Sequence, residues 1–328
     1  MKRRTRTTLL AMAAAALVLP VAACSSGNSA SGSTNPAGQK VVYVPGLTGN
    51  PFYTSVGCGA AAEAKKTGID FSTQGAPTFS VPLQTQIVNS VAATNPAAIM
   101  ISITDPTSMK APLLQAKNAG IKVITIDGDL ADKSIATTNI QSDNFKGGQL
   151  AGQKLAELIG GKGDVIALDN VAGSLIAAAR LGGFLDALKA HPDIHFGGSQ
   201  YTQNSTANAA TTASTAATTN PKLAGIYSLA TNNTQGAITG LREVNKTNAV
   251  KLVGFDSSDP IVEALHAGTI GAVILQDPLT EGAMGIDSAV NAIEHKPVPR
   301  DQAATFAVAT PANVDSPEVQ SHIYKTHC

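Results

Sequence analysis

The sequence predicts an α/β protein of two doubly wound domains, each built on a parallel sheet. From Lys40 onward, short β-rich apolar segments alternate with segments whose apolar residues recur at helical spacing. Such alternation is typical of parallel strands that helices cover on both faces. Roughly a dozen strand–helix units within about 270 residues suit two sheets better than one. No internal repeat of roughly 20–50 residues is visible, which argues against a solenoid.

The first half of the chain contains four of the expected strands and four of the expected helices. Asn50-Pro51 places a capping residue before a proline at the first helical position, and Gly68 is typical of a helix end. We expect strands over residues 41–44, 69–73, 98–103 and 123–126, and helices over residues 51–66, 81–94, 109–119 and 147–159.

The second half of the chain repeats the alternation and ends on a helix followed by a strand. We expect strands over residues 165–168, 195–198, 224–227, 252–255, 272–275 and 305–309. We expect helices over residues 175–189, 206–219, 235–243, 260–267 and 281–293.

The N-terminus has the composition of an export signal. Four basic residues among the first six precede an apolar stretch over residues 9–19, which is too short to span a bilayer. Small residues then lead directly to Cys24, and this junction resembles a bacterial lipobox. The resemblance implies a signal peptide over residues 1–23 and lipidation of Cys24. An ordinary signal peptide, in which Cys24 is incidental, is the alternative.

The segment that follows the signal is expected to be a flexible tether over residues 24–39. After Cys24 it contains no charge and no aliphatic residue larger than Ala, so it cannot bury enough apolar area to fold. A lipid anchor and a tether would hold the folded part at the extracytoplasmic face of the cell membrane. No later run of the sequence reaches membrane-spanning length.

The charge balance argues against nucleic acid as a partner. Lys and Arg number 23, as do Asp and Glu, and the net charge is zero. Loss of residues 1–23, with four basic and no acidic residues, would leave 19 basic and 23 acidic residues. Nucleic-acid binding needs a basic surface instead. A transcriptional repressor of the same fold would also need an N-terminal helix-turn-helix where the export signal stands.

The sequence carries no recognisable metal, cofactor or catalytic motif. It has no GxxxxGK[ST], GxSxG or HExxH pattern and no zinc-like spacing of Cys and His. The acids around Asp127-Gly128-Asp129 lack the further oxygens of a calcium loop. We therefore expect no cofactor, no metal and no enzyme. Gly57-Cys58-Gly59 lies within a predicted helix, where small residues allow close helix packing. Cys58 and Cys328 are compatible with a disulfide or with two free thiols.

Polar residues gather directly after the predicted strands. In open parallel sheets the ligand lies beyond the carboxyl ends of the strands, so residues at these positions are the site candidates. They are Asn50, Asp127, Asp129, Asp256 and Gln276.

Six segments, in order along the chain, resemble one known family. They are Asn50-Pro51-Phe52-Tyr53, Val123–Asp127, Ser142-Asp143-Asn144 with Gly147-Gly148, Arg180 with Gly183-Phe184, Gly254-Phe255-Asp256, and Gln276-Asp277-Pro278. Together they resemble ABC-transporter sugar-binding proteins of the ribose-binding, type I periplasmic class. Residues 75–81 also resemble the autoinducer-2 and rhamnose branch of that family.

The resemblance implies two domains joined by three crossover strands, with a monosaccharide captured by hinge closure and delivered to an ABC permease. It implies an N-terminal lobe of residues 40–138 plus 277–309 and a C-terminal lobe of residues 139–276 plus 310–328. The sugar contacts it implies are Asn50, Phe52, Tyr53, Asp127, Arg180, Asp256 and Gln276.

Three positions depart from the ribose-type pattern. Gly128 stands where Arg is frequent, the aromatic stacking position falls on Asn204, and a polar position falls on Ala230, with Asn232 nearby. A missing stacking face argues against ribose itself. We expect a small neutral polyol, which is a pentose, a hexose, a deoxy sugar or a sugar alcohol, bound by a monomer.

Two further functions use the same fold. A sensory binding protein that presents an autoinducer-2-like furanose to a receptor would need the same cleft as an importer. A cleft hydrolase would need a nucleophile–base pair, and the six His residues do not follow the strand ends as that requires.

Overall fold

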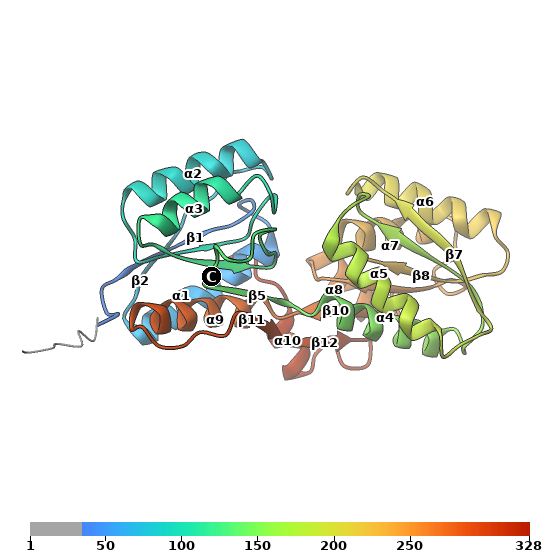
Figure 1. Ribbon diagram of the computed structural model, residues 1–328. Helices are drawn as coiled ribbons and strands as arrows, with labels where there is room; N and C mark the ends of the chain where they lie inside the picture. Colours follow the sequence, from blue (N-terminus) through green and yellow to red (C-terminus); the bar gives the residue numbers. More distant parts are fainter. Residues whose placement is uncertain (1–34) are drawn as a thin grey trace, which may run out of the picture. The chain divides into compact units, whose positions relative to one another are not determined.

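The computed structural model describes residues 35–328, which form two α/β lobes (Figure 1). The expected signal peptide, the lipidation site Cys24 and residues 25–34 of the tether lie outside the described residues. Within the described part, no helix is long and apolar enough to cross a membrane.

The first lobe is a parallel six-stranded sheet in the order β11-β5-β4-β3-β1-β2. Helices α1 and α9 cover one face, and α2 and α3 cover the other (Figure 1). The strands are β1 (Lys40–Val44), β2 (Asp70–Thr73), β3 (Ala98–Ile101), β4 (Lys122–Ile126), β5 (Thr138–Ser142) and β11 (Asp301–Ala304). The helices are α1 (Pro51–Thr67), α2 (Val81–Ala93), α3 (Lys110–Asn118) and α9 (Pro278–Ile293).

The second lobe has a six-stranded sheet in the order β12-β10-β9-β8-β6-β7, in which β12 alone is antiparallel. Helices α4 and α5 pack on one face and α6, α7 and α8 on the other. The strands are β6 (Gly163–Asp169), β7 (Ile194–Tyr201), β8 (Leu223–Ser228), β9 (Lys251–Phe255), β10 (Ala272–Gln276) and β12 (Phe306–Ala309). The helices are α4 (Asn144–Leu158), α5 (Leu175–Leu188), α6 (Thr206–Thr219), α7 (Thr231–Glu243), α8 (Asp259–His266) and α10 (Pro317–His322).

The central strands of each sheet are buried on both faces, which explains why they read as unbroken apolar runs. In β6, Val165 and Ala167 belong to the core beneath α4 and α5, whereas Ile166 and Leu168 belong to the core beneath α6 and α7. Successive side chains of a strand point to opposite faces, so a strand between two helical layers needs apolar residues at every position. The predicted fold class is confirmed.

The chain passes between the two sheets three times, after β5, after β10 and between β11 and β12. Strand β5 is not predicted from the sequence, because most of its residues are polar. Thr125 Oγ1 donates a 3.0 Å hydrogen bond to buried Asn139 Oδ1, so the polar side chain is satisfied inside the lobe.

The strand expected over residues 305–309 is two strands in different sheets. Residues 301–304 pair in the first sheet and residues 306–309 in the second. Sheet membership therefore differs from the expected lobe boundaries, because residues 139–142 lie in the first sheet and residues 306–309 in the second.

Glycines let α1 and α9 pack with their backbones in contact. A Cβ on Gly59 would lie 1.9 Å from the Leu279 carbonyl oxygen, a separation that no real Cβ adopts. At Gly57, two residues earlier in α1, the nearest atom to such a Cβ is Thr73 Oγ1 at 3.6 Å, an ordinary contact. The close approach helps to fix α9, which follows the β10 crossing, against α1.

Gly59→Ala is therefore expected to lower the free energy of unfolding by roughly 1–3 kcal/mol, because the added methyl forces the helices apart. Gly57→Ala is the matched control and should be neutral or stabilising by up to about 1 kcal/mol through helix propensity. Urea denaturation of both variants measures the difference. Equal midpoints for the two would contradict the packing assignment.

Candidate functional site

A cavity of about 370 Å³ is lined by residues of both lobes at the carboxyl ends of their strands. The first lobe contributes the start of α1 and Asp127, which follows β4, to the lining. The second lobe contributes residues that follow β6, β8, β9 and β10, together with Arg180 of α5. Strand ends are where a parallel α/β sheet places its ligand.

The start of α1 is fixed by its own cap. The Asn50 side chain accepts hydrogen bonds from the backbone N–H groups of Phe52 at 2.9 Å and Tyr53 at 3.3 Å. The two rings meet edge to face, with centroids 5.6 Å apart. The Tyr53 hydroxyl donates a hydrogen bond to Asp127. Asn50, Phe52 and Tyr53 all line the cavity, as expected from the sequence.

Asp127 and Asp256 occupy the same local conformation in the two lobes. Their φ angles are 69° and 68°, in the left-handed region that non-glycine residues seldom adopt. Each donates its backbone N–H over 2.9 Å to the neighbouring strand, to Ile140 in the first lobe and to Ile274 in the second. In each lobe, a hydrogen bond to the sheet thus holds an uncommon backbone conformation. Residues held in such conformations are typical of binding sites.

Arg180 is a buried side chain, and the alternative of a surface salt bridge is excluded by its 5% exposure. Its Nε donates to Asn144 Oδ1 and its Nη1 to the Leu229 carbonyl oxygen, both at 2.8 Å. The guanidinium lies 3.7 Å from the centroid of the Phe255 ring. Nη1 also approaches Asp256 Oδ2 at 3.9 Å.

Two glycine motifs make this arrangement of Arg180 possible. A Cβ on Gly148 of α4 would lie 1.9 Å from the Arg180 carbonyl oxygen, and a Cβ on Gly183 of α5 would lie 1.8 Å from that of Phe145. The helices therefore touch along their backbones, which brings Asn144 at the start of α4 within reach of Arg180.

Asp256 is not the cap of α8, since Ser258 occupies the capping position. Its Oδ1 accepts hydrogen bonds from Gln276 Nε2 at 2.7 Å and from the Tyr324 hydroxyl at 2.8 Å. Its Oδ2 accepts a longer bond, 3.3 Å, from Thr231 Oγ1. The carboxylate is thus oriented by three donors of the chain.

Arg180 is the one cation among the described residues that line the cavity, and it faces two carboxyl groups. Burial raises the pKa of Asp127 to about 6. The Arg180 charge and the Tyr53 hydrogen bond pull that pKa down, whereas the Asp256 charge pushes it up. Burial also raises the pKa of Tyr53 and Tyr324, so both phenols remain hydrogen-bond donors.

Glu281, in the first turn of α9, is completely buried beside the crossing after β5. Ser142 Oγ donates to its Oε1 over 2.8 Å. Burial raises its pKa well above the ordinary value, and the negative charge of Asp127 adds to the rise. The neutral acid is therefore favoured at this position.

Most of the other sequence candidates also line the cavity. Gln276, Asn204, Ala230 and Asn232 do so, and the Asn232 amide donates to the Asn204 carbonyl oxygen at 3.0 Å. Asp129 does not line the cavity. Its carboxylate instead accepts a 2.9 Å ion-paired hydrogen bond from Arg300, because three residues beyond the end of β4 the chain has turned toward the residue that precedes β11.

Several further lining residues are not among those predicted from the sequence. Asn170, Ser174, Thr231, Gln235 and Ser257 lie shortly after strands or near the start of helices in the second lobe, which is the signal that could have found them. Tyr324 comes from the segment after α10, and no motif or strand end marks it in the sequence.

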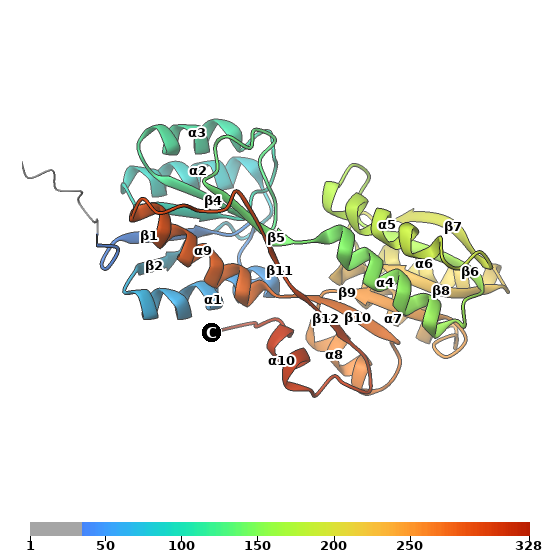
Figure 2. The same ribbon diagram turned by 60° about the horizontal axis from the view of Figure 1, so that its bottom comes forward.

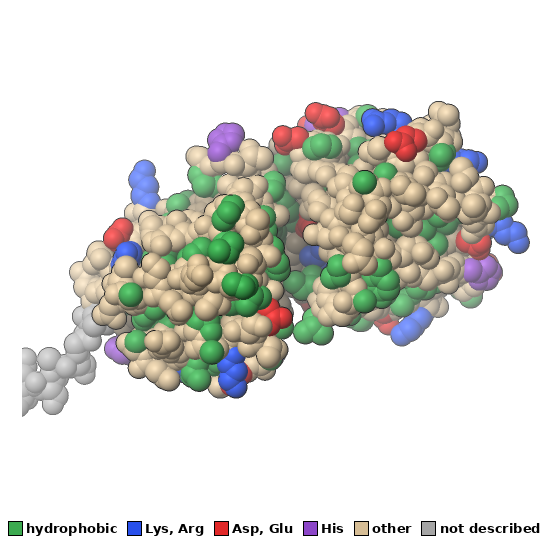
Figure 3. Space-filling model, turned by 90° about the horizontal axis from the view of Figure 1, so that it is seen from above, with side chains coloured by type: hydrophobic (Ala, Val, Ile, Leu, Met, Phe, Trp, Pro, Cys, Tyr) green, Lys and Arg blue, Asp and Glu red, His purple; other side chains and the backbone are tan. Residues whose placement is uncertain are grey.

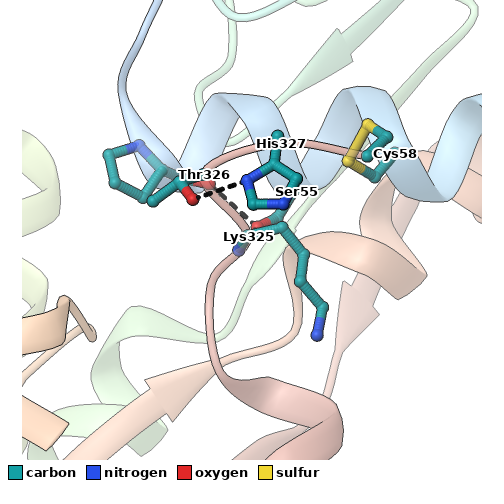
Figure 4. Close-up of a disulfide and its surroundings, with 7 residues drawn as sticks. Ser55, Cys58, Lys325, Thr326 and His327 are labelled. Carbon is teal, nitrogen blue, oxygen red and sulfur yellow. Dashed lines mark hydrogen bonds between the residues drawn. A yellow bond between two sulfur atoms is a disulfide. The ribbon is translucent and has the colours of Figure 1, made fainter.

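The same C-terminal segment is joined covalently to the first lobe. Cys328 forms a disulfide with Cys58 of α1, with the two Cα atoms 5.4 Å apart, and the Lys325 backbone N–H donates to Ser55 Oγ at 2.6 Å (Figure 4).

A second cavity, of about 410 Å³, is lined by second-lobe residues only, near the beginning of β9. Lys154 and Glu157 in its wall pair with each other at 2.6 Å. It contains none of the sequence-predicted site residues. Among the described residues, no group of three or more His, Cys, Asp or Glu is placed to hold a metal ion.

The surface charge in Figure 3 is mixed. Basic and acidic side chains are scattered over this face, and neither sign gathers into a broad patch. The view therefore offers no stripe of positive charge for a phosphate backbone.

Residues 41–297 match the family model described as periplasmic binding protein domain. The chain belongs to this family. The match covers both lobes, and the two helix-covered six-stranded sheets are the type I form of the fold.

The relatives of this periplasmic binding protein include proteins solved with a bound sugar and proteins named for sugar import. A solute-binding protein of an ABC transporter from Agrobacterium vitis, solved with α-D-tagatopyranose, is 31% identical with a TM-score of 0.82, over 88% of this chain and 99% of that one. One from Actinobacillus succinogenes, solved with D-allose, is 27% identical with a TM-score of 0.78, over 84% and 98%. The ribose import binding protein of Escherichia coli is 28% identical over 76% of this chain and 83% of its own.

The raised pKa of Asp127 predicts a pH-dependent stability of this binding protein without ligand. The folded-state pKa, about 6, lies above the unfolded value of about 3.9, so the folded state binds the proton more tightly. The contribution of Asp127 is therefore most favourable below about pH 4 and is lost as the pH rises through about 6.

Asp127→Asn should remove this loss of stability at higher pH, because the Asn side chain does not ionise. We expect it to stabilise the ligand-free protein by roughly 1–3 kcal/mol at about pH 7.5 and to have little effect at about pH 4. Denaturation at both pH values measures the difference, with the exposed Asp193→Asn as control. An equal effect of Asp127→Asn at both pH values would show that Asp127 does not titrate as described.

Proposed function

We propose that this protein captures a neutral monosaccharide or sugar alcohol outside the cytoplasm and delivers it to an ABC permease. The observation that carries the proposal is that Asp127 of the first lobe and Asp256 of the second line one cavity together with Arg180. Sugar import proteins are also the relatives of this chain.

The side chains match the chemistry of a polyol. A carboxylate accepts hydrogen bonds from neighbouring hydroxyl groups, and such charge-assisted bonds are strong. Arg180 donates in a planar fork to a hydroxyl or ring oxygen. The Phe52 and Tyr53 rings offer apolar faces to the C–H side of a sugar, and a cavity of about 370 Å³ has the size of a small-molecule site.

A ligand that touches both lobes would favour a closed state by its differential affinity for that state. Exclusion of water on closure strengthens the hydrogen bonds of the two carboxylates. Hinge closure about the three crossings is thus the proposed mechanism of capture, and the same closed form would dock on the permease.

Binding alone is proposed, without a reaction. No His or Cys is among the described residues that line the cavity, and the two carboxyl groups are both engaged by donors of the chain. Within the described lining, a hydroxyl or thiol nucleophile activated by a His is therefore absent. We propose that the protein acts as a monomer.

We propose that the ligand is a pentose, a hexose, a deoxy sugar or a sugar alcohol. Asn204 and Ala230 leave one side of the cavity without an aromatic face. A thermal-shift screen against these classes identifies the ligand, since a ligand that binds only the folded state raises the melting temperature.

With that ligand, the variants Asp127→Ala, Arg180→Ala and Asp256→Ala should each bind roughly 10- to 100-fold more weakly, because each loses a charged hydrogen-bond partner. Asp129→Ala is the matched control, since Asp129 lies near Asp127 in the chain but outside the cavity. Calorimetry on the four proteins is the test. If the three variants bind like the Asp129→Ala protein, the sugar does not occupy this cavity.

Anchoring through a lipid on Cys24 is proposed from the small residues that precede it and the uncharged segment that follows. Cys24→Ser should abolish incorporation of labelled palmitate and leave the protein soluble or unprocessed. Equal labelling of the variant and the wild type would overturn the anchor.

A further inference from the structure

The C-terminal segment of residues 323–328, here called the tail, connects the two lobes a fourth time. It leaves α10, which packs on β10 and β12 of the second lobe. It ends on α1 of the first lobe, where Cys328 is bonded to Cys58 and the Lys325 N–H donates to Ser55 (Figures 2 and 4). Unlike the three backbone crossings, this connection depends on a covalent bond between side chains.

Tyr324 lies in the middle of the tail and contacts both lobes. Its backbone N–H donates to Ser257 Oγ at 2.9 Å and its hydroxyl to Asp256 Oδ1 at 2.8 Å, both in the second lobe. Its ring meets Phe52 of the first lobe edge to face, with centroids 5.6 Å apart. The side chain is 7% exposed and forms part of the cavity wall.

The Tyr324 hydroxyl and the Gln276 amide both donate to the same carboxylate oxygen of Asp256. Oδ1 already accepts two short hydrogen bonds, from Tyr324 and from Gln276. Oδ2 has only the 3.3 Å bond from Thr231 and the more distant Arg180. A sugar hydroxyl would therefore find its acceptor at Oδ2, beside the guanidinium.

A chain end of six residues without secondary structure ordinarily frays. Here the backbone of Tyr324 itself is held by its hydrogen bond to Ser257, and the end of the tail is held by the Cys58–Cys328 disulfide. The disulfide restricts where the tail can go, and thereby keeps the phenol over Asp256.

We propose that Tyr324 is a positioning residue of the sugar site and that the Cys58–Cys328 disulfide holds it there, so that the tail sets the affinity and the choice of sugar. The inference rests on the proposed sugar-binding function. Tyr324 adds an aromatic side chain of the tail to the cavity wall beside Phe52. The competing role is a covalent staple that stabilises the fold without affecting the ligand.

The test uses full-length wild type, Tyr324→Phe, the pair Cys58→Ala/Cys328→Ala, and the triple variant that combines them. Tyr201→Phe is the control, since Tyr201 is an exposed tyrosine of β7 outside the cavity. Calorimetry measures the affinity for D-ribose, D-arabinose, D-allose and D-tagatose, and thermal unfolding without sugar measures stability. The cysteine pair leaves Tyr324 intact, so it tests the tail even if Tyr324→Phe folds poorly.

We expect Tyr324→Phe and the cysteine pair each to weaken binding of the preferred sugar about 10-fold and to change the order of preference among the four. In the background without the disulfide, the further effect of Tyr324→Phe should shrink to less than about threefold, because the two changes act through one contact. Tyr201→Phe should bind like wild type.

The inference is overturned if wild type binds a sugar while both variants keep its affinity and order of preference, whatever their melting temperatures. Fully independent effects of the two changes would also overturn the link between disulfide and tyrosine. Two free thiols in denatured, unreduced Cys24→Ser protein would show that Cys58 and Cys328 are not bonded, and would overturn the inference. Wild type that binds none of the pentoses, hexoses, deoxy sugars and sugar alcohols of the thermal-shift screen defeats the proposed function, and the inference with it.

Discussion

The buried guanidinium of Arg180 lies over the ring of Phe255 and 3.9 Å from a carboxylate oxygen of Asp256. A buried cation is costly unless it is paired and hydrogen-bonded, and here the chain supplies both. Close packing of α4 on α5 brings Asn144 to the guanidinium, and the end of β8 brings the Leu229 carbonyl. Several strands and helices of the second lobe thus meet at one buried charge and satisfy it.

The same charge explains why the site suits a neutral ligand. One guanidinium faces the two carboxyl groups of Asp127 and Asp256, and burial raises the pKa of Asp127 to about 6 although the Arg180 charge pulls that pKa down. An anionic ligand would add to the negative charge, whereas hydroxyl groups donate to it. Asp127 and Asp256 come from different lobes and have the same backbone conformation. A ligand between them would donate hydrogen bonds to both carboxylates.

The sequence predicts the fold well because most of the central strands, covered on both faces, are apolar at nearly every position. It also places Asp127 and Asp256 in the site, since both follow strands. It misses β5, whose polar residues are satisfied only by tertiary contacts, and it misplaces Asp129, which turns to Arg300. Tyr324 could not be foreseen, because its partner Asp256 is 68 residues away and no local pattern links them.

The most direct test of this account is a crystal structure of the protein with its sugar bound. The account predicts one sugar per chain in the cavity of about 370 Å³, with hydroxyl oxygens about 3 Å from carboxylate oxygens of both Asp127 and Asp256 and from a nitrogen of Arg180. A sugar held elsewhere, such as in the cavity beside Lys154, or one that touches neither carboxylate, would contradict it.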